Sequence, residues 1–333
     1  MNTVPSLPGL LQRFFTERLM TQRQVSAHTM ASYRDSFRLL LRFAQRERHK
    51  CPSTLDLTDL DADLIGRFLT DLEKQRRCSA RTRNARLTAV RSFFHYAAYQ
   101  EPALSEGIQR VLAIPYKRLA KPLVGFLSPS EIEALLAAPD RTTWIGRRDH
   151  ALLVLAVQTG LRLSELTSLD RTAVVLGTGA HVRCQGKGRK ERCTPLTAST
   201  IAVLRTWLKE PTKHGGGEIL FPNRHGGRLS SDSVQHLVRK YVDAAATQCP
   251  SIKEKRVSPH VLRHSTAMEL LGAGVDSSVI ALWLGHESVN TTQIYLHAHL
   301  ALKEAALAKT TPRNVKPGRF RPDDRLLGFL NAL

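Results

Sequence analysis

Acidic residues are scarce in this chain of 333 residues. Aspartate and glutamate together number 29 against 49 lysines and arginines, so the formal net charge is +20. An excess of positive charge on this scale favours a polyanionic partner. A basic surface that only kept the protein in solution would not require the arginines to crowd particular segments, as they do here. A nucleic acid is therefore the expected partner.

Long apolar runs are also missing, and cysteines are few. No apolar stretch reaches the roughly 18 to 20 residues that cross a bilayer, and no basic amphipathic segment carries a broad aromatic face. The 5 cysteines are scattered without a Cys-x-x-Cys pair, which argues against a disulfide framework and a structural zinc. The first residues, Met-Asn-Thr-Val-Pro, lack the pattern of a secretion signal. We expect a cytoplasmic protein that does not contact a membrane.

Residues 1–113 show helical periodicity only. Apolar residues recur there at three- and four-residue spacing, which places them on one face of a helix. The successive stripes include Leu7, Leu11 and Phe14; Met30, Tyr33 and Phe37; Leu64, Phe68 and Leu72; and Leu87, Val90 and Phe94. The pattern predicts a small helical bundle as the first of two domains.

A run of cations follows Glu73 with no further acid up to residue 91. Cations packed this closely repel one another, so contact with phosphates is a better interpretation than a merely solvated helix face. The run consists of Lys74, Arg76, Arg77, Arg81, Arg83, Arg86 and Arg91. These residues are the first candidates for DNA binding.

Residues 114–126 form a predicted basic linker between the domains. Pro115 and Pro122 disfavour helix there. Lys117, Arg118 and Lys121 lie in the same stretch and could follow a DNA backbone.

The second predicted domain covers residues 127–309 and opens with a helix signal, Ser128 as the N-cap and Pro129 as the first helical residue. Residues 149–158 are almost wholly apolar and predict a buried helix that Gly160 ends. Alternating segments around a Gly-Lys-Gly tip predict a β-hairpin within residues 181–196. The fold class is therefore mainly α, with a small antiparallel sheet. Residues 310–333 form a tail, which we expect to be flexible before its apolar end at 326–333.

Polar side chains that could take part in binding or catalysis gather at predicted helix ends in the second domain. Ser258 and Pro259 predict a helix start that puts His260 in the first turn and Arg263 one turn further on the same face. A helix amino terminus beside a histidine and an arginine can bind an anion. His286 follows a predicted helix end at Gly285. His264 is interpreted as a packing residue, because no glutamate follows His260 as a His-Glu-x-x-His zinc motif would require.

Together these residues match the needs of transfer at a phosphodiester. Arg162 and Arg263 can clamp the non-bridging oxygens with paired donors, and His286 can donate to the same phosphate. Tyr295, in the second turn of a helix that Asn290 can cap, can serve as the nucleophile once its phenol is activated by these cations or by His260. Lys187 at the hairpin tip can protonate the leaving 5′ oxygen. The spacing alone does not separate that role from backbone binding by a basic hairpin, to which Arg189 and Lys190 also belong.

No metal site and no cofactor are predicted. Asp59, Asp61 and Asp63 resemble the start of a calcium loop, but Leu64 stands where that loop needs glycine and Thr70 where it needs glutamate. The three acids are interpreted as residues of a helix start.

Five motifs resemble those of the tyrosine recombinase, or phage integrase, family, in the family's order and over about residues 120–305. They are Thr-Gly-Leu-Arg-Leu-Ser-Glu, Gly-Lys-Gly-Arg-Lys-Glu-Arg, Ser-Pro-His-Val-Leu-Arg-His, Leu-Gly-His-Glu-Ser and Thr-Thr-Gln-Ile-Tyr. The resemblance implies that Tyr295 forms a 3′-phosphotyrosyl bond and that Glu165 supports the catalytic arginine and histidine. The implied activating set is Arg162, Lys187, His260, Arg263 and His286. It also implies that residues 1–113 are a core-binding domain, which closes a C-shaped clamp on DNA with the second domain.

Three functions share these features. The first is a site-specific recombinase or integrase of a phage, a mobile element or a chromosome-resolution system, which needs neither ATP nor a divalent metal. The second is a type IB topoisomerase-like enzyme, and the third is a non-catalytic DNA-binding regulator. A compact helical amino-terminal domain and the helix expected after Tyr295 favour the first over the second, and the complete residue set argues against the third. The residues of the carboxy-terminal segment leave it open that the segment folds back on its own domain. The resemblance instead implies docking of this segment on a neighbour and a tetramer on double-stranded DNA, and it leaves room for a partner recombinase or an accessory DNA-binding protein.

Overall fold

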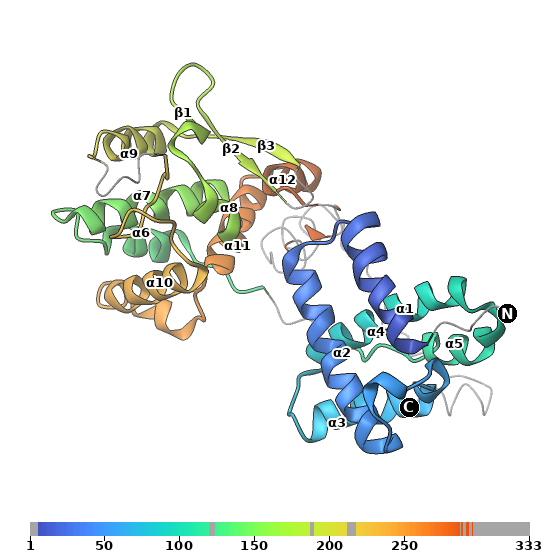
Figure 1. The fold of residues 1–333 in the computed structure, drawn as a ribbon. Coiled ribbons are helices and arrows are strands. Elements are labelled where there is room, and N and C mark those ends of the chain that lie inside the picture. Colours follow the sequence, from blue (N-terminus) through green and yellow to red (C-terminus); the bar gives the residue numbers. More distant parts are fainter. Residues whose placement is uncertain are drawn as a thin grey trace, which may run out of the picture. The chain divides into compact units, whose positions relative to one another are not determined.

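The computed structural model describes residues 6–119, 124–186, 190–211, 218–286, 288, 291–292 and 295. The chain divides into two compact units, residues 1–121 and 122–333, and the division falls inside the predicted linker at 114–126. The expected mainly α class with a small antiparallel sheet is confirmed (Figure 1). Among the described residues, no helix is long and apolar enough to span a bilayer.

The first unit is a helical bundle, as its periodicity predicts. Its elements are α1 (Leu7–Arg13), the π-helical η1 (Phe14–Gln22), α2 (Ala27–Arg48), η2 (Pro52–Thr54), η3 (Leu57–Asp59), α3 (Ala62–Lys74), α4 (Ala80–Gln100), η4 (Pro102–Leu104) and α5 (Ser105–Leu112). Side chains cap three of the long helices: Ser26 accepts from the backbone at the start of α2, Asp61 at α3 and Ser79 at α4. Each helix therefore begins where its sequence supplies a capping oxygen.

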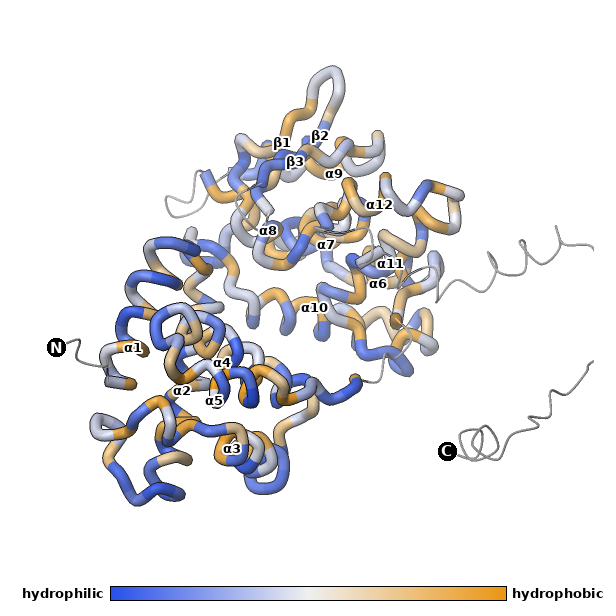
Figure 2. Tube along the Cα trace, turned by 90° about the vertical axis from the view of Figure 1, so that its right-hand side faces the viewer, coloured by the Kyte–Doolittle hydropathy of each residue, from blue (hydrophilic) through white to orange (hydrophobic). Residues whose placement is uncertain are grey.

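An aromatic cluster holds this bundle together. The ring of Phe93 lies edge-on to those of Phe14, Phe37 and Phe94, with centroids 5.4 to 5.6 Å apart. Edge-to-face contacts add to the burial of apolar area. Because Phe14, Phe37 and Phe93 come from η1, α2 and α4, the cluster ties three elements together, and Figure 2 shows these helices alternating between hydrophilic and hydrophobic residues.

The second unit consists mainly of helices and carries a short sheet at one edge (Figure 1). Its elements are α6 (Pro129–Ala137), α7 (Trp144–Thr159), α8 (Leu163–Ser168), η5 (Arg171–Ala173), β1 (Val174–Val175), β2 (His181–Gln185), β3 (Glu191–Pro195), α9 (Ala198–Leu208), α10 (Ser231–Ala245), η7 (Pro250–Glu254), α11 (Pro259–Gly272) and α12 (Ser277–Leu284). The strands are antiparallel in the order β1-β2-β3, and Cys184 of β2 pairs with Arg192 of β3. The predicted hairpin is therefore β2 and β3.

Helix α7 is the buried helix that the apolar run predicts, and it packs against α9 and α11. It ends at Gly160, whose φ of 61° is left-handed. A Cβ at this position would come within 2.6 Å of Leu284 Cδ2 in α12. Glycine is thus required both by the backbone turn and by the close approach of α12.

Gly146 provides a test of this packing. A Cβ there would come within 1.8 Å of the backbone oxygen of Asp140. A backbone atom cannot move aside as the end of a flexible side chain could. We expect Gly146→Ala to lower the free energy of unfolding by about 2 to 3 kcal/mol, because the turn before α7 must shift. Gly177→Ala in the same unit is the control, since its Cβ would meet nothing within 4 Å. Urea denaturation of both variants measures the difference. Equal stability of Gly146→Ala and Gly177→Ala would contradict the packing described for Gly146.

Candidate active site

Three arginines converge on the carboxyl end of α12. Arg192 donates to the carbonyl oxygen of Trp283 at 3.2 Å, Arg263 to that of Leu284 at 2.7 Å and Arg162 to that of Gly285 at 2.7 Å. Carbonyls of a helix's last turn have no partner within the helix, and they form the negative end of its dipole. The end of α12 therefore positions three guanidinium groups that come from β3, α11 and the start of α8.

Arg263 is the most buried of the three, with 3% of its surface exposed. Its second donor reaches the carbonyl oxygen of Gly160 at 2.6 Å, so one guanidinium joins the ends of α7 and α12. Burial lowers the pKa of Arg263 to about 10, and the nearby charge of Arg162 acts in the same direction. An anion bound beside these two arginines would relieve their repulsion.

Glu165 is the buried carboxylate that makes this grouping of cations possible. Arg192 holds both of its oxygens, at 2.9 and 2.7 Å, while Arg162 donates a side-chain nitrogen at 2.9 Å and its backbone nitrogen at 2.8 Å. Burial acts to raise the pKa of Glu165, but the hydrogen bonds from Arg192 and the Arg162 backbone outweigh it and hold the pKa below its ordinary value. Arg162 and Arg192 thus share one carboxylate, and with Arg263 nearby the site keeps an excess of positive charge.

Arg192 is a site residue that sequence reasoning missed. It belongs to the second motif, but a basic hairpin offered no reason to separate it from its neighbours. The side chain is only 13% exposed. It also packs beneath Gly285, where a Cβ would come within 2.8 Å of Arg192 Nη1. The side chains of a strand alternate between its two faces, which could have separated Arg192 from its exposed neighbours in β3. The burial of Arg192, however, became visible only with the fold.

Tyr295 lies at the same site with its ring buried, at 1% exposure. Its hydroxyl is 2.9 Å from Nδ1 of His264, and its ring stacks at 6.3 Å from that of His286. Burial raises the pKa of Tyr295, although Arg263 and Arg162 act to lower it. His264, interpreted from sequence as a packing residue, therefore contacts the predicted nucleophile through a polar atom.

The two predicted catalytic histidines reach the site from different elements. His286 follows Gly285, whose φ is 65°, and its Nδ1 lies 2.9 Å from the hydroxyl of Thr292. His260 lies in the first turn of α11 with its ring 4.2 Å from that of His264. Burial, then Arg263 and Arg162, lower the pKa of His286 to about 4 and also lower the pKa of His260. Both imidazoles are therefore neutral at pH 7 in this arrangement.

The hairpin tip lies outside the described residues, and with it Lys187 and Arg189. What the structure gives is the base of the hairpin, where the Gly186 backbone nitrogen donates to the Lys190 carbonyl at 2.7 Å. The side chain of Lys190 is exposed. Lys121 of the linker, Asn290 and residues 300–333 of the carboxy-terminal segment also lie outside the described residues.

The predicted DNA-binding arginines and lysines of the first unit differ in their contacts. Arg83 is buried and donates to the Pro115 carbonyl at 2.9 Å, while Arg86 donates to the Ser32 carbonyl and the Ser36 hydroxyl, each at 3.0 Å. These two stabilise the unit itself. Exposed positions are held by Lys74, Arg76, Arg77, Arg81, Lys117 and Arg118, of which Lys117 pairs with Glu73.

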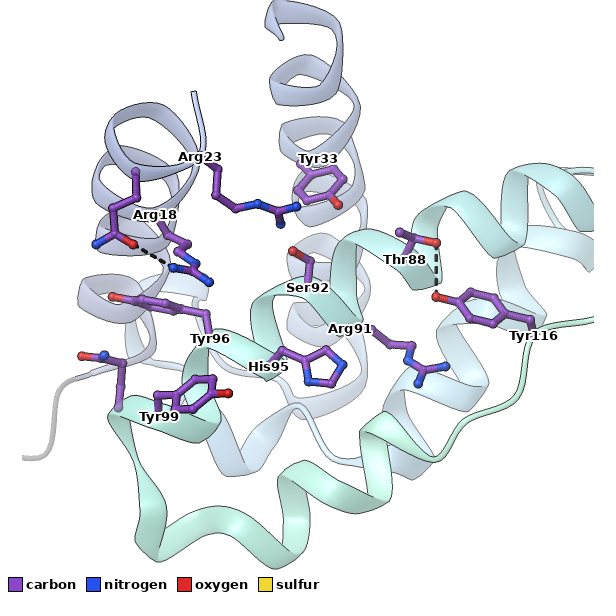
Figure 3. A pocket seen from close by; sticks show the side chains of 12 residues that line it. Arg18, Arg23, Tyr33, Thr88, Arg91, Ser92, His95, Tyr96, Tyr99 and Tyr116 are labelled. Carbon is purple, nitrogen blue, oxygen red and sulfur yellow. Dashed lines mark hydrogen bonds between the residues drawn. The ribbon is translucent and has the colours of Figure 1, made fainter. Parts of the chain in front are cut away.

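Arg91 belongs instead to a hollow that sequence reasoning missed. This cavity of about 690 Å³ is lined by Arg18, Arg23 and Arg91, by His95 and by four tyrosines, without any acidic residue among its lining. Figure 3 shows side chains from η1 and the residue that follows it, from α2 and α4, and from the chain after α5. The guanidinium of Arg91 lies 5.0 Å from the centre of the Tyr116 ring. We name this hollow the arginine–tyrosine pocket.

The acids considered for calcium serve as helix caps. Asp61 caps α3, Asp63 lies in its first turn and Asp59 completes a capping box at η3. The expectation of a helix start is confirmed at this point. Within the described ranges, no group of three or more His, Cys, Asp or Glu residues is placed to hold a metal ion.

Two family models match the chain. The phage integrase family matches residues 125–301, and the phage integrase N-terminal SAM-like domain matches residues 12–101. The chain is 61% identical over 328 residues to "Putative integrase/recombinase y4rC" of Sinorhizobium fredii, covering 98% of each chain. It is 32% identical to tyrosine recombinase XerD of Pseudomonas putida, over 93% of this chain and 100% of that one.

Solved structures have the same fold. A XerH recombinase bound to a palindromic difH substrate matches with a TM-score of 0.66 at 23% identity, over 86% of this chain and 81% of that one. The Tn1549 transposon integrase with circular intermediate DNA matches with a TM-score of 0.67 at 16% identity, over 90% and 99%.

The fold is thus that of a DNA recombinase, and arginines, histidines and a tyrosine gather at one place in its second unit. The chain belongs to the phage integrase family, the tyrosine recombinases that carry out site-specific DNA recombination.

Arg192→Ala tests the role of the ion pair with Glu165. Since the folded pKa of Glu165 lies below its ordinary value of 4.5, its stabilising contribution is present above that pH and is lost as pH falls through the folded pKa. We expect the variant to lose about 3 kcal/mol of unfolding free energy at pH 7, because it leaves the buried carboxylate with fewer partners. The difference from the unmodified protein should shrink below pH 4.5.

The matched control is Arg228→Ala, which breaks the exposed pair with Asp170 in the same unit. Exposed pairs contribute less than about 1 kcal/mol, so this variant should be nearly as stable as the unmodified protein. Urea denaturation at several pH values measures both. A loss of stability for Arg192→Ala that is independent of pH would show that Glu165 is not the group through which Arg192 acts.

Proposed function

We propose that the protein cleaves and rejoins DNA strands through a covalent bond between Tyr295 and a 3′ phosphate. The observation that carries this proposal is the convergence of three arginines with one carboxylate beside a buried tyrosine. An unbalanced group of guanidiniums suits a phosphate that gains charge in its transition state. The tyrosine supplies an oxygen nucleophile at the same place.

The steps follow from these positions. The Tyr295 oxygen attacks phosphorus, a new O–P bond forms, and the bond to the 5′ oxygen breaks. Arg162 and Arg263 stabilise the non-bridging oxygens, and His286 and His260 contribute neutral imidazole donors. The phenol proton passes to the neutral imidazole of His260 and the departing 5′ oxygen takes a proton from Lys187, so the protons balance and the released strand ends in a hydroxyl group. The reverse reaction with another strand's 5′ hydroxyl completes strand exchange and requires neither ATP nor a divalent metal.

Lys187 is the proposed acid for the departing oxygen. Its hairpin is tied to the site at the base, because Arg192 of β3 binds Glu165 and the end of α12. Lys187 follows Gln185 of β2 by two residues in the sequence, so it is joined directly to an anchored strand.

Double-stranded DNA is the proposed substrate. The exposed cations of the first unit, together with the arginine–tyrosine pocket, offer guanidiniums to the phosphates and tyrosine hydroxyls as further donors. The relatives support this: the XerH and Tn1549 structures are described as complexes with DNA. The names of the transposon integrase and of the integrase/recombinase relative support recombination of a mobile element, although phage or chromosome-resolution systems use the same chemistry.

We also propose that the enzyme acts as a tetramer on two DNA sites. The second unit carries a largely apolar cavity of about 950 Å³, whose lining includes Ile132, Leu136, Val154 and Met268. We name it the α6–α11 groove, because α6, α7 and α11 supply these residues. The apolar segment 326–333 of a neighbouring copy has the chemistry to fill it, and residues 310–325 supply the length to reach across.

Tyr295→Phe tests the chemistry. The variant keeps the buried ring and removes only the hydroxyl, so folding and DNA binding should remain while cleavage disappears. We expect a denaturant-resistant adduct from the unmodified protein, also in excess EDTA, and none from the variant. The probes are nicked duplexes selected for binding from a randomised pool, and the adduct is measured on denaturing gels. An adduct with Tyr295→Phe would show that another residue is the nucleophile.

Truncation after Lys309 tests the assembly. We expect the shortened protein to bind a single site normally but to form fewer paired complexes, because the groove loses its occupant. Leu136→Glu should have the same effect by placing a charge in the groove, whereas Ala137→Glu, an exposed neighbour outside the lining, should not. Light scattering with two-site DNA measures pairing. Normal pairing by both the truncated protein and Leu136→Glu would show that neither segment nor groove is needed.

A further inference from the structure

Tyr295 has a hydrogen-bond partner outside the proposed catalytic set. Its hydroxyl lies 2.9 Å from Nδ1 of His264, and the two rings meet edge to face with centroids 5.4 Å apart. His264 comes from α11, the helix that also carries Arg263 and His260. The ring of His260 packs against it at 4.2 Å. His264 is therefore held in place from one side and faces the phenol on another.

The chemistry of the two groups sets the direction of this hydrogen bond. A phenol is a much stronger acid than a neutral imidazole N–H, and an imidazole nitrogen is the stronger base, so we assign the hydroxyl as the donor and Nδ1 as the acceptor. The burial of His264, together with the charges around it, disfavours the imidazolium, which could not accept. Nδ1 of His264 is thus available to accept a hydrogen bond from the phenol.

We propose that His264 is a positioning residue that stabilises the state in which Tyr295 is not bonded to DNA. It does so by accepting a hydrogen bond that only the free Tyr295 phenol can donate. This inference rests on the proposed function. When the Tyr295 oxygen becomes bonded to phosphorus, its proton is gone and the 5′ oxygen carries a proton instead. The phosphotyrosyl ester has nothing to donate to Nδ1, and the buried acceptor loses its partner. The covalent state therefore lacks one favourable interaction that the state with intact DNA has.

This bias has a use in strand exchange. Cleavage by transesterification exchanges one phosphodiester for another, so its intrinsic equilibrium is close to balanced. A hydrogen bond that forms only in the non-covalent state shifts the cleavage equilibrium toward rejoined strands and shortens the time for which the DNA is broken. The same contact fixes the phenol beside Arg263 and Arg162 before DNA arrives.

His264→Phe tests the proposal, because phenylalanine keeps a flat ring and removes the acceptor. On an intact duplex, where rejoining is free to occur, the ratio of covalent to non-covalent complex should rise about fivefold, the effect of one lost hydrogen bond. His264→Asn retains an acceptor and should lie within about twofold of the unmodified protein. His236→Phe, at an exposed position of α10, is the matched control and should leave the ratio unchanged.

The sign of the change separates this role from a merely structural one. General damage to the site would lower the covalent fraction, so an unchanged or lower ratio in folded, DNA-binding His264→Phe would overturn the proposal. Should that variant not fold, ¹⁵N NMR of the unmodified protein decides: we expect Nδ1 of His264 to be unprotonated and hydrogen-bonded. A proton on Nδ1 would overturn it. Absence of any adduct from the unmodified protein would instead reject the proposed function, and the NMR result would still decide the hydrogen bond.

Discussion

The carboxyl end of α12 is the feature on which the site depends. Three successive carbonyl oxygens, those of Trp283, Leu284 and Gly285, each accept a hydrogen bond from a different arginine. Arginines this close together repel one another, and burial increases the cost. The carbonyl dipoles and the single carboxylate of Glu165 offset part of that cost. The remaining positive charge favours the binding of an anion beside these side chains.

The same helix end also explains why segments far apart in the chain meet. Arg162 begins α8, Arg192 lies in β3 and Arg263 lies in α11, and each is placed by its own local structure. Gly160 and Gly285 both end helices in the left-handed conformation, and each allows a close approach that a Cβ would block. The turn after Gly285 then places His286 beside Tyr295. The geometry of the site thus follows from two helix ends more than from any single catalytic residue.

Local sequence signals predicted the elements of this site well. Ser258 with Pro259, the apolar run before Gly160 and the Gly-Lys-Gly hairpin are signals that act over a few residues, and the structure has a helix start, a buried helix and paired strands at these places. The chemistry of Arg162, Arg263, His286 and Tyr295 suggested a shared phosphate site, but spacing along the chain does not determine distances between helices, so the expectation that they converge rested mainly on the family resemblance. Arg192 and His264 were assigned no role for the same reason: a basic strand residue and a helical histidine acquire one only through Glu165 and Tyr295.

Charge alone was a poor guide to which arginines are free to bind DNA. Arg83 and Arg86 belong to the most basic stretch of the sequence, yet their guanidiniums satisfy carbonyl and hydroxyl oxygens within the first unit. Arg18 and Arg23 lie well outside that stretch and line the arginine–tyrosine pocket with Arg91. A long guanidinium on an amphipathic helix can point along the helix face to a neighbouring backbone or away from it, and the sequence does not distinguish the two. The surface available to phosphates is therefore a property of the folded unit, assembled from η1, α2 and α4 together.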